Sequence, residues 1–460
     1  MTDYIVAIDL GTSHITGIVG EKNVDGTFSV VSCEMVDSLS SCIHRGNIYN
    51  VENTAKQVGR LLKKLESSLK GNYIDRVYVG VGGQSVRTVD HMEYIEIESG
   101  EVVSTGDIRM LEEKCGKYKP DLLDVLGVAP AIYYVDGRKE ENPVGVPCNR
   151  LEARYKIVVG RKSIRRELTK SLSERCGKEI VGIIVSPLAL ADAMLSNEEK
   201  ELGCALVDFG AGATSVTVYK NGDLLYSAVI PLGGNLITRD IISLQLTEAL
   251  SEKLKKEYGC AILKKEDDGK MIKIDMEGDD REISVNDLNA IIEARAKEIV
   301  ENVYARISEV IDVKSLGYGI VISGHASELK DLPELIQERF KIKVRHSAIR
   351  GGLVRGDDSM TGNPLYMTAV SIMLKGTEPC VSCPLAPSEP VVEEDNGSND
   401  ENEKEEEKIT ARRGGFFRSK RNKAKSDTDT AHRTESGNSG DDDKKGRNWG
   451  SLFDDLFKES

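Results

Sequence analysis

The chain has 460 residues, enough for two to four domains at about 100 to 200 residues per domain. Its 76 Asp and Glu against 62 Lys and Arg give a net charge of −14, which argues against nonspecific nucleic-acid binding by the whole molecule. The sequence has no apolar run of the roughly 20 residues that span a bilayer and no signal-peptide pattern at its start, so we expect a cytosolic body with peripheral membrane contacts at most.

A strand, an Asp-x-Gly turn and a second strand open the chain at residues 4–19. Asp9 ends the first strand, and Gly11, Thr12 and Ser13 follow it. Glycine allows close approach of the backbone, and successive N–H groups with hydroxyls suit the oxygens of a phosphate. An ordinary β-turn uses the same residue types, so this hairpin alone leaves both interpretations open.

A separate strand and helix module interrupts the first half of the chain. Alternating residues at 92–97 and 155–159 predict strands, and an amphipathic pattern around 107–118 predicts a helix. A packing insertion without a partner and a partner-binding subdomain both fit this pattern.

Residues 204–219 repeat the opening hairpin about 200 residues later. Two such hairpins, each opening an α/β half, imply paired lobes that face each other across a cleft. The two strand-end carboxylates could then hold Mg²⁺ directly or through its waters. The residues of this second turn are Asp208, Gly210, Gly212, Ala213 and Thr214.

Two further segments are candidates for binding a nucleoside. Glu252 and Lys255 share one face of a predicted helix and could bracket a ribose and an adenine. Gly324 follows a buried strand and precedes a predicted helix, whose N-terminus could receive phosphates or sugar closely. A solvated charged helix and a plain strand-to-helix turn are the alternatives.

The clearest long helix is predicted over residues 287–311. Its apolar residues form one stripe at helical spacing, which predicts a core-facing side. Arg295 lies among the charged residues outside that stripe.

The alternation of strands and helices stops near residue 384. Acidic, basic and polar blocks follow, and such blocks cannot bury enough apolar surface to fold, so residues 384–447 are predicted to be a disordered linker. The basic block at 412–425 could contact lipid or nucleic acid, or could be a solvated run. Cys380 and Cys383 have metal-ligand spacing but lack a second ligand pair, which favours a chance spacing.

Residues 448–460 have one apolar face of a short helix. Such a helix is too short to be stable alone in water and needs a surface on which to fold. Flanking Lys and Arg favour anionic lipid, whereas two Asp residues detract from that attraction, and a protein groove remains the alternative. The apolar residues are Trp449, Leu452, Phe453, Leu456 and Phe457.

The two Asp-x-Gly hairpins and the late glycine turn, in this order, resemble the superfamily of actin, hexokinase and heat-shock-chaperone ATPases. Further segments resemble the FtsA family of actin-like bacterial cell-division proteins. They lie at residues 134–152, 196–210, 292–299 and 363–370.

This resemblance implies an α/β fold with two actin-like lobes and an inserted α+β subdomain in the first lobe. The first lobe would comprise residues 1–84 and 163–197, with the insert at 85–162. The second lobe would comprise 198–258 and 318–383, with a smaller subdomain at 259–317. The linker and the terminal helix would follow.

The resemblance also implies ATP and Mg²⁺ as cofactors, with the two turns around the phosphates, Asp9 and Asp208 near the metal, and Gly324, Glu252 and Lys255 around the nucleoside. Two positions depart from the superfamily pattern. His325 stands where a second glycine is usual, and Ser186 stands where a glutamate commonly orients the attacking water. A neutral hydroxyl cannot act as a carboxylate base at pH 7, so we expect slow or negligible hydrolysis.

The partners implied by the resemblance are those of a division scaffold at the cytoplasmic face of the inner membrane. They are the C-terminal tail of FtsZ near Arg295, further copies of this chain in a filament, anionic lipid at the terminal helix, and later division proteins at the insert. The alternatives are a small-molecule kinase on the same fold, a chaperone-like ATPase, for which Ser186 in place of glutamate is unfavourable, and an actin-like scaffold for pilus assembly or cell shape.

Overall fold

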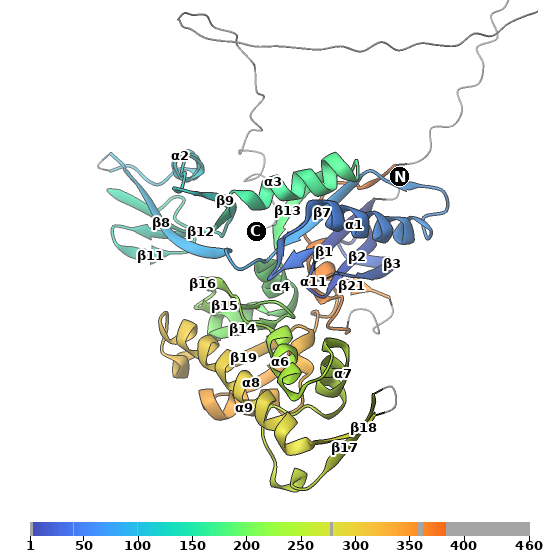
Figure 1. Ribbon diagram of the computed structural model, residues 1–460. Coiled ribbons are helices and arrows are strands. Elements are labelled where there is room, and N and C mark those ends of the chain that lie inside the picture. Colours follow the sequence, from blue (N-terminus) through green and yellow to red (C-terminus); the bar gives the residue numbers. More distant parts are fainter. Residues whose placement is uncertain (1–2, 40, 99, 277–278, 357–361, 383–460) are drawn as a thin grey trace, which may run out of the picture. The chain divides into compact units, whose positions relative to one another are not determined.

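Residues 3–382, except 40, 99, 277–278 and 357–361, are described by the computed structural model (Figure 1). They fall within one structural unit, Met1–Pro384. The expected linker at 384–447, its basic block at 412–425, the terminal helix at 448–460 and Cys383 lie outside the described residues.

A six-stranded sheet forms the centre of the first lobe, in the order β13-β7-β1-β2-β3-β21. Strand β1 is antiparallel to β2 and parallel to β7. Residues 5–8 of β1 are fully buried because both faces of the sheet are covered. The strands are β1 (Tyr4–Leu10), β2 (His14–Lys22), β3 (Phe28–Asp37), β7 (Arg76–Val81), β13 (Glu179–Val185) and β21 (Val354–Arg355), with the short pairs β4 (Ile43–His44) with β5 (Asn47–Ile48) and β6 (Tyr73–Ile74) with β22 (Val381–Ser382).

Helices cover the two faces of this sheet. Helix α1 (Val51–Glu66) packs on β2 and β3, and its first turn is capped by Asn50, whose side chain accepts a hydrogen bond from the Asn53 N–H. Helix α11 (Met367–Met373) packs on β1, β2 and β7, and α4 (Ser186–Met194) packs on α11. Helix α3 (Ser163–Leu168) continues into the π-helical segment η1 (Thr169–Arg175), which contacts α1.

The inserted module comes between β7 and α3 in the sequence and lies to the left of the six-stranded sheet in Figure 1. Helix α2 begins with a capping box between Ser104 and Asp107 and buries Leu111 and Cys115. Strand β8 also contacts β16 of the second lobe, so the sheets of the insert and of the second lobe form one ten-stranded sheet. The elements of the insert are β8 (Arg87–Glu96), α2 (Thr105–Gly116), β9 (Leu123–Val128), β10 (Ile132–Val135), β11 (Arg138–Glu140) and β12 (Arg150–Arg161).

The second lobe is built on the strands β14 (Cys204–Phe209), β15 (Thr214–Lys220), β16 (Asp223–Ile230), β19 (Gly319–Ser323) and β20 (Val344–His346). Apolar side chains of its helices pack on one face of this sheet, and α4 packs on the other, so α4 joins the two lobes. The helices are α5 (Asn197–Leu202), α6 (Gly234–Ile241), α7 (Glu248–Tyr258), α8 (Val285–Ser308) and α9 (Leu332–Phe340), with the short helices η2 (Ile242–Leu244), η3 (Lys265–Asp267), η4 (Val313–Ser315) and η5 (His325–Glu328), and the hairpin β17 (Met271–Met276) with β18 (Asp279–Ser284).

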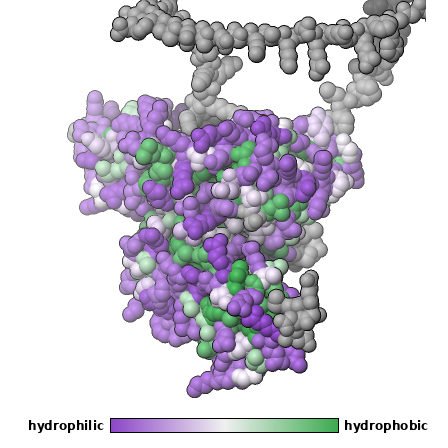
Figure 2. All heavy atoms as spheres, in the orientation of Figure 1, coloured by the Kyte–Doolittle hydropathy of each residue, from purple (hydrophilic) through white to green (hydrophobic). Residues whose placement is uncertain are grey.

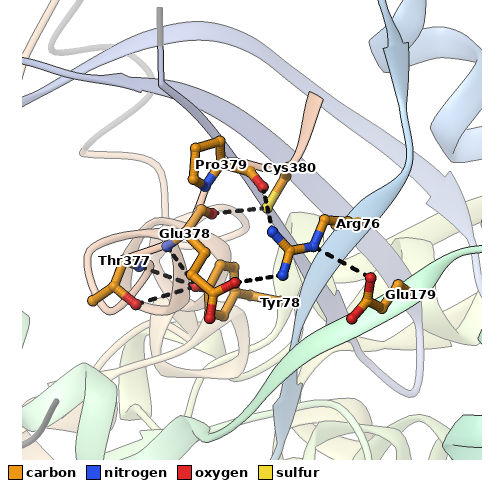
Figure 3. Close-up of polar contacts among 7 residues, drawn as sticks. All are labelled: Arg76, Tyr78, Glu179, Thr377, Glu378, Pro379 and Cys380. Atoms are coloured by element: carbon orange, nitrogen blue, oxygen red, sulfur yellow. Dashed lines mark hydrogen bonds and ion pairs between the residues drawn. The ribbon is translucent and has the colours of Figure 1, made fainter. Parts of the chain in front are cut away.

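The segment that follows α11 is fixed to the start of β7 (Figure 3). The Tyr78 hydroxyl accepts hydrogen bonds from the backbone N–H groups of Thr377 (3.0 Å) and Glu378 (2.9 Å). Arg76 donates to the Pro379 carbonyl at 3.2 Å and forms an ion pair with Glu378. These contacts hold the last described residues at the start of β7. Gly80 and Gly82, which line the cavity described below, lie at the opposite end of this strand.

The face of the described body in Figure 2 is mainly hydrophilic, and its hydrophobic residues gather in separate patches rather than in a belt. Within the part of the chain that the structure describes, we found no helix with the length and apolar character needed to cross a membrane.

Candidate nucleotide site between duplicated turns

The two Asp-x-Gly hairpins have the same strand register. In the first, Leu10 pairs with Ile15, and in the second, Phe209 pairs with Thr214, so four residues lie between the last paired residues of each hairpin. The first glycine of each turn packs against the carbonyl three residues later, and an added Cβ would lie 2.5 Å from that oxygen in one turn and 2.8 Å in the other. The internal repeat seen in the sequence is therefore also a repeat in structure.

Both turns open into one cavity of about 1230 Å³. The cavity also reaches helix α7 and the turn after β19. It thus brings together eleven of the twelve residues that the sequence suggested for a cofactor, namely Asp9, Gly11, Thr12, Ser13, Asp208, Gly210, Gly212, Ala213, Glu252, Lys255 and Gly324.

Thr214, the twelfth residue, is placed differently from the expectation. Its side chain is fully buried, and its hydroxyl donates a hydrogen bond to the Leu232 carbonyl at 2.8 Å. It corresponds to the buried Ile15 of the first hairpin, whereas the next residue, Ser215, lines the cavity. Side chains alternate along a strand, so a shift of one position exchanges a ligand-facing side chain for a core-facing one.

Glycines at two positions allow the backbone to close around the cavity. A Cβ on Gly212 would lie 2.4 Å from the Thr12 hydroxyl oxygen of the opposite turn. Gly324 has a φ of +84°, and a Cβ there would lie 2.4 Å from the Phe209 carbonyl oxygen. Each position therefore requires glycine, because a larger residue would push the two walls apart.

The helix expected after the small-residue turn does not begin at Gly324. The short η5 (His325–Glu328) follows, and helix α9 begins only at Leu332. Gly324 therefore borders the cavity through its close backbone approach and not through the N-terminus of a long helix. Small and acidic residues occur both in turns that lead directly into a long helix and in turns that do not. The residues after Gly324 therefore did not distinguish the two cases.

The carboxyl groups of Asp9 and Asp208 lie at the base of the cavity. Burial, together with the charge of Asp208, raises the pKa of Asp9 from 3.8 to about 7. Burial raises the pKa of Asp208 to about 6. Two carboxylates without a nearby cation are costly to ionise, which makes this place suitable for a divalent cation.

The residues present fit Mg²⁺ bound with phosphate. Among the described residues, no group of three or more His, Cys, Asp or Glu side chains could hold a metal alone. Mg²⁺ commonly binds through one or two carboxylates, several waters and substrate phosphates. Asp9, Asp208 and the N–H groups of the two turns supply that kind of environment.

Helices α6 and α7 support the second turn. The Gly234 N–H donates to the Gly210 carbonyl at 3.0 Å, and the Asn235 N–H donates to the Ala211 carbonyl at 2.8 Å. Lys255 pairs with Glu252 at 2.6 Å and donates to the Gly234 carbonyl at 3.2 Å. Burial lowers the pKa of Lys255 more than the ion pair with Glu252 raises it.

Ser186 and Pro187 of α4 also line the cavity. Ser186 is 6% exposed, and its hydroxyl oxygen is buried without a protein hydrogen-bond partner. Where the superfamily pattern commonly has a glutamate, this chain therefore has a buried hydroxyl without a protein hydrogen-bond partner.

Two lining histidines were not selected as candidates from the sequence. His14 ends the first turn, and His325 had been noted only for its possible effect on the pocket. The internal repeat carried a signal for His14, because it occupies the turn position of Ala213, which had been selected.

Arg295 lies outside the cavity lining, on α8. It forms a bidentate ion pair with Asp240 of α6, with N–O distances of 2.6 and 3.2 Å, and a second pair with Glu298. The Arg295 guanidinium thus links α8 to α6 and is already occupied by two carboxylates.

Comparison with known proteins identifies the family. Residues 205–371 match the family model described as "Cell division protein FtsA", and residues 83–159 match the model described as "SHS2 domain inserted in FTSA". The chain is 32% identical to the cell division protein FtsA of Porphyromonas gingivalis over 387 residues, covering 83% of this chain and 80% of that protein. It is 30% identical to FtsA of Pseudomonas aeruginosa, covering 81% and 89% of the two chains.

The fold has a counterpart among solved structures. A chain of the PilM-PilN type IV pilus biogenesis complex matches with a TM-score of 0.56 at 14% identity, covering 82% of this chain and 99% of that chain. The expected actin-like fold with an inserted subdomain is confirmed. With the relatives above, these matches show that the chain belongs to the FtsA family of cell-division proteins.

Proposed function

We propose that this protein binds ATP with Mg²⁺ between its two lobes and acts as a nucleotide-dependent scaffold in cell division. The observation that supports this most strongly is the pair of equivalent turns, Gly11–His14 and Gly210–Ala213, that open into one cavity from opposite lobes. Asp9 and Asp208 would hold the Mg²⁺, whose chemistry there would be to neutralise phosphate charge.

The nucleotide would act mainly as a conformational ligand. A ligand shifts the balance between open and closed lobes only by its difference in affinity for the two states, and one that contacts both turns has such a difference. Ser186 offers a hydroxyl where a carboxylate base would be needed, so purified protein with Mg-ATP should release phosphate slowly or not at all. Brisk steady-state release would contradict this part of the proposal.

The cellular role that we propose is the attachment of FtsZ filaments to the cytoplasmic face of the inner membrane at the division site. The chain would polymerise there, and its insert would contact later division proteins. Membrane contact is assigned to residues 448–460, because their apolar residues share one helical face next to basic residues.

The C-terminal tail of FtsZ would bind near Arg295, whose guanidinium suits an acidic peptide. The ion pair with Asp240 means that such a peptide would have to compete with this carboxylate or bind beside it. Arg295→Glu should weaken FtsZ binding, and unaltered binding would remove this residue from the proposal.

The test is co-sedimentation of the full-length protein with FtsZ on anionic liposomes, with and without Mg-ATP. We expect FtsZ to pellet with the liposomes only when the protein is present, and more of it with ATP. The matched controls are a chain that ends at Lys445 and the full-length variant Phe453→Glu, both of which should leave FtsZ in the supernatant. Equal pelleting by wild type and both controls would refute the membrane assignment.

A further inference from the structure

Two histidines border the cavity from opposite lobes. His14 ends the turn between β1 and β2, and His325 follows Gly324 after β19. The turn geometry itself does not require a histidine, because Ala213 occupies the position of His14 in the equivalent turn. An explanation for these side chains must therefore come from the cavity.

Charged groups of two elements, β3 and α7, surround His14. Its Nε2 lies 3.8 Å from an oxygen of Asp37 on β3. Lys256 and Glu252, both on α7 of the opposite lobe, also act on its charge. The His14 ring is thus close enough to the second lobe for charges there to affect its pKa.

The surroundings of His325 include the same groups. Lys256 and Glu252 of α7, Glu328 of η5 and His14 of the first lobe all act on its charge. His14, His325 and Lys256 all line the cavity, so three basic side chains border it from the two lobes. The Glu252 carboxylate is shared between two lysines. It lies 3.5 Å from Lys256 and 2.6 Å from Lys255.

Burial disfavours the charged form of both histidines. Burial lowers the pKa of His14, and the charge of Lys256 lowers it further. Burial, Lys256 and His14 together lower the pKa of His325. An anion placed among these three bases would reverse that balance, because it favours the protonated rings and accepts charge-assisted hydrogen bonds from them.

We propose that His14 and His325, together with Lys256, form a clamp across the two lobes that binds the phosphate groups of the nucleotide and takes up protons as it does so. The inference rests on the proposed nucleotide binding and adds to it the residues that select a phosphorylated ligand. Adenosine, which lacks phosphate, would not engage the clamp.

The experiment measures equilibrium binding of ATP and of adenosine to the full-length protein between pH 6 and pH 8. EDTA is present, so that metal binding does not contribute. The proteins are wild type, the double variant His14→Gln/His325→Gln, and the control His91→Gln. His91 also has a carboxylate partner, Glu93 at 2.9 Å, but it lies in the insert.

We expect wild type and His91→Gln to bind ATP more tightly at pH 6 than at pH 8. In the double variant, this increase in ATP affinity should be about tenfold smaller. Protonation of Asp9, Asp208 and ATP itself contributes equally in all three proteins, so the difference between the pH profiles reports the histidines. Adenosine binding should be the same in all three. The single variant His325→Gln should lose part of the gain and serves if the double variant does not fold.

Equal pH profiles of ATP binding in wild type and the histidine variants would overturn the clamp. A loss of adenosine binding that matches the loss of ATP binding would also overturn it, since the histidines would then act on the pocket as a whole. Absence of ATP binding by wild type in EDTA at every pH would also overturn the clamp, whereas absence of Mg-ATP binding by wild type without EDTA would refute the proposed function.

Discussion

Replacing Asp9 by Asn should have opposite effects on the empty and the ligand-bound protein. The folded-state pKa of Asp9 is about 7, against an ordinary value of 3.8. The folded protein therefore binds this proton more tightly than the unfolded chain does. By linkage, the stability of the ligand-free protein falls as pH rises from about 4 to about 7 and remains lower above that range.

The size of this effect follows from the pKa. A tenfold change in acidity corresponds to about 1.4 kcal/mol, so the full change from 3.8 to about 7 would correspond to at most about 4 kcal/mol. Water in the open cavity screens the charge. We therefore expect Asp9→Asn to raise the free energy of unfolding of the ligand-free protein at pH 8 by roughly 1 to 2 kcal/mol.

Thermal or urea unfolding at pH 5 and pH 8, with and without Mg-ATP, would measure both effects. At pH 8 the variant should be more stable than wild type without ligand, and it should lose the stabilisation that Mg-ATP gives to wild type through binding to the folded state. The matched control is Asp90→Asn, which changes a carboxylate on an 81% exposed side chain in the insert. A variant that is less stable at pH 8 without ligand, or that keeps the full effect of Mg-ATP, would refute the reasoning.

Three further substitutions test other parts of the structure. Gly324→Ala places a Cβ 2.4 Å from the Phe209 carbonyl oxygen at a φ of +84°. It should therefore lower the free energy of unfolding by about 1 to 3 kcal/mol and weaken nucleotide binding. Unchanged binding in a calorimetric titration would contradict the close approach. Tyr78→Phe removes the acceptor of two backbone N–H groups and should cost about 1 to 3 kcal/mol in urea unfolding, with faster hydrogen exchange at residues 377–382 and normal ATP binding; unaltered exchange there would contradict the contacts in Figure 3. Asp240→Asn frees Arg295 from its bidentate partner and should strengthen binding of an FtsZ tail peptide about threefold to tenfold, whereas weaker binding would show that the ion pair builds the binding surface.

The sequence was sufficient for the parts of the fold that repeat. The same strand, turn and strand pattern occurs at Asp9 and Asp208, and a pattern that occurs twice identifies paired lobes even though each hairpin alone is ambiguous. The register of the two hairpins then places both turns at one cavity.

Other features depend on contacts between distant segments, which a local pattern does not contain. Thr214 was expected at the ligand, but the alternation of β15 directs it to the Leu232 carbonyl. Arg295 was expected to be available for a peptide, but α6 brings Asp240 to it. His14 and His325 come to line one cavity only when the lobes pack together.

The central claim is that the nucleotide binds between the two equivalent turns. Calorimetric titration of Mg-ATP into wild type and into a folded Gly212→Val variant tests it most directly, because a side chain at Gly212 would meet Thr12 of the opposite turn, its Cβ only 2.4 Å from the hydroxyl oxygen. The account predicts saturable binding of one Mg-ATP per wild-type chain and no measurable binding to the variant. Equal binding by both proteins, or no binding by wild type, would contradict it.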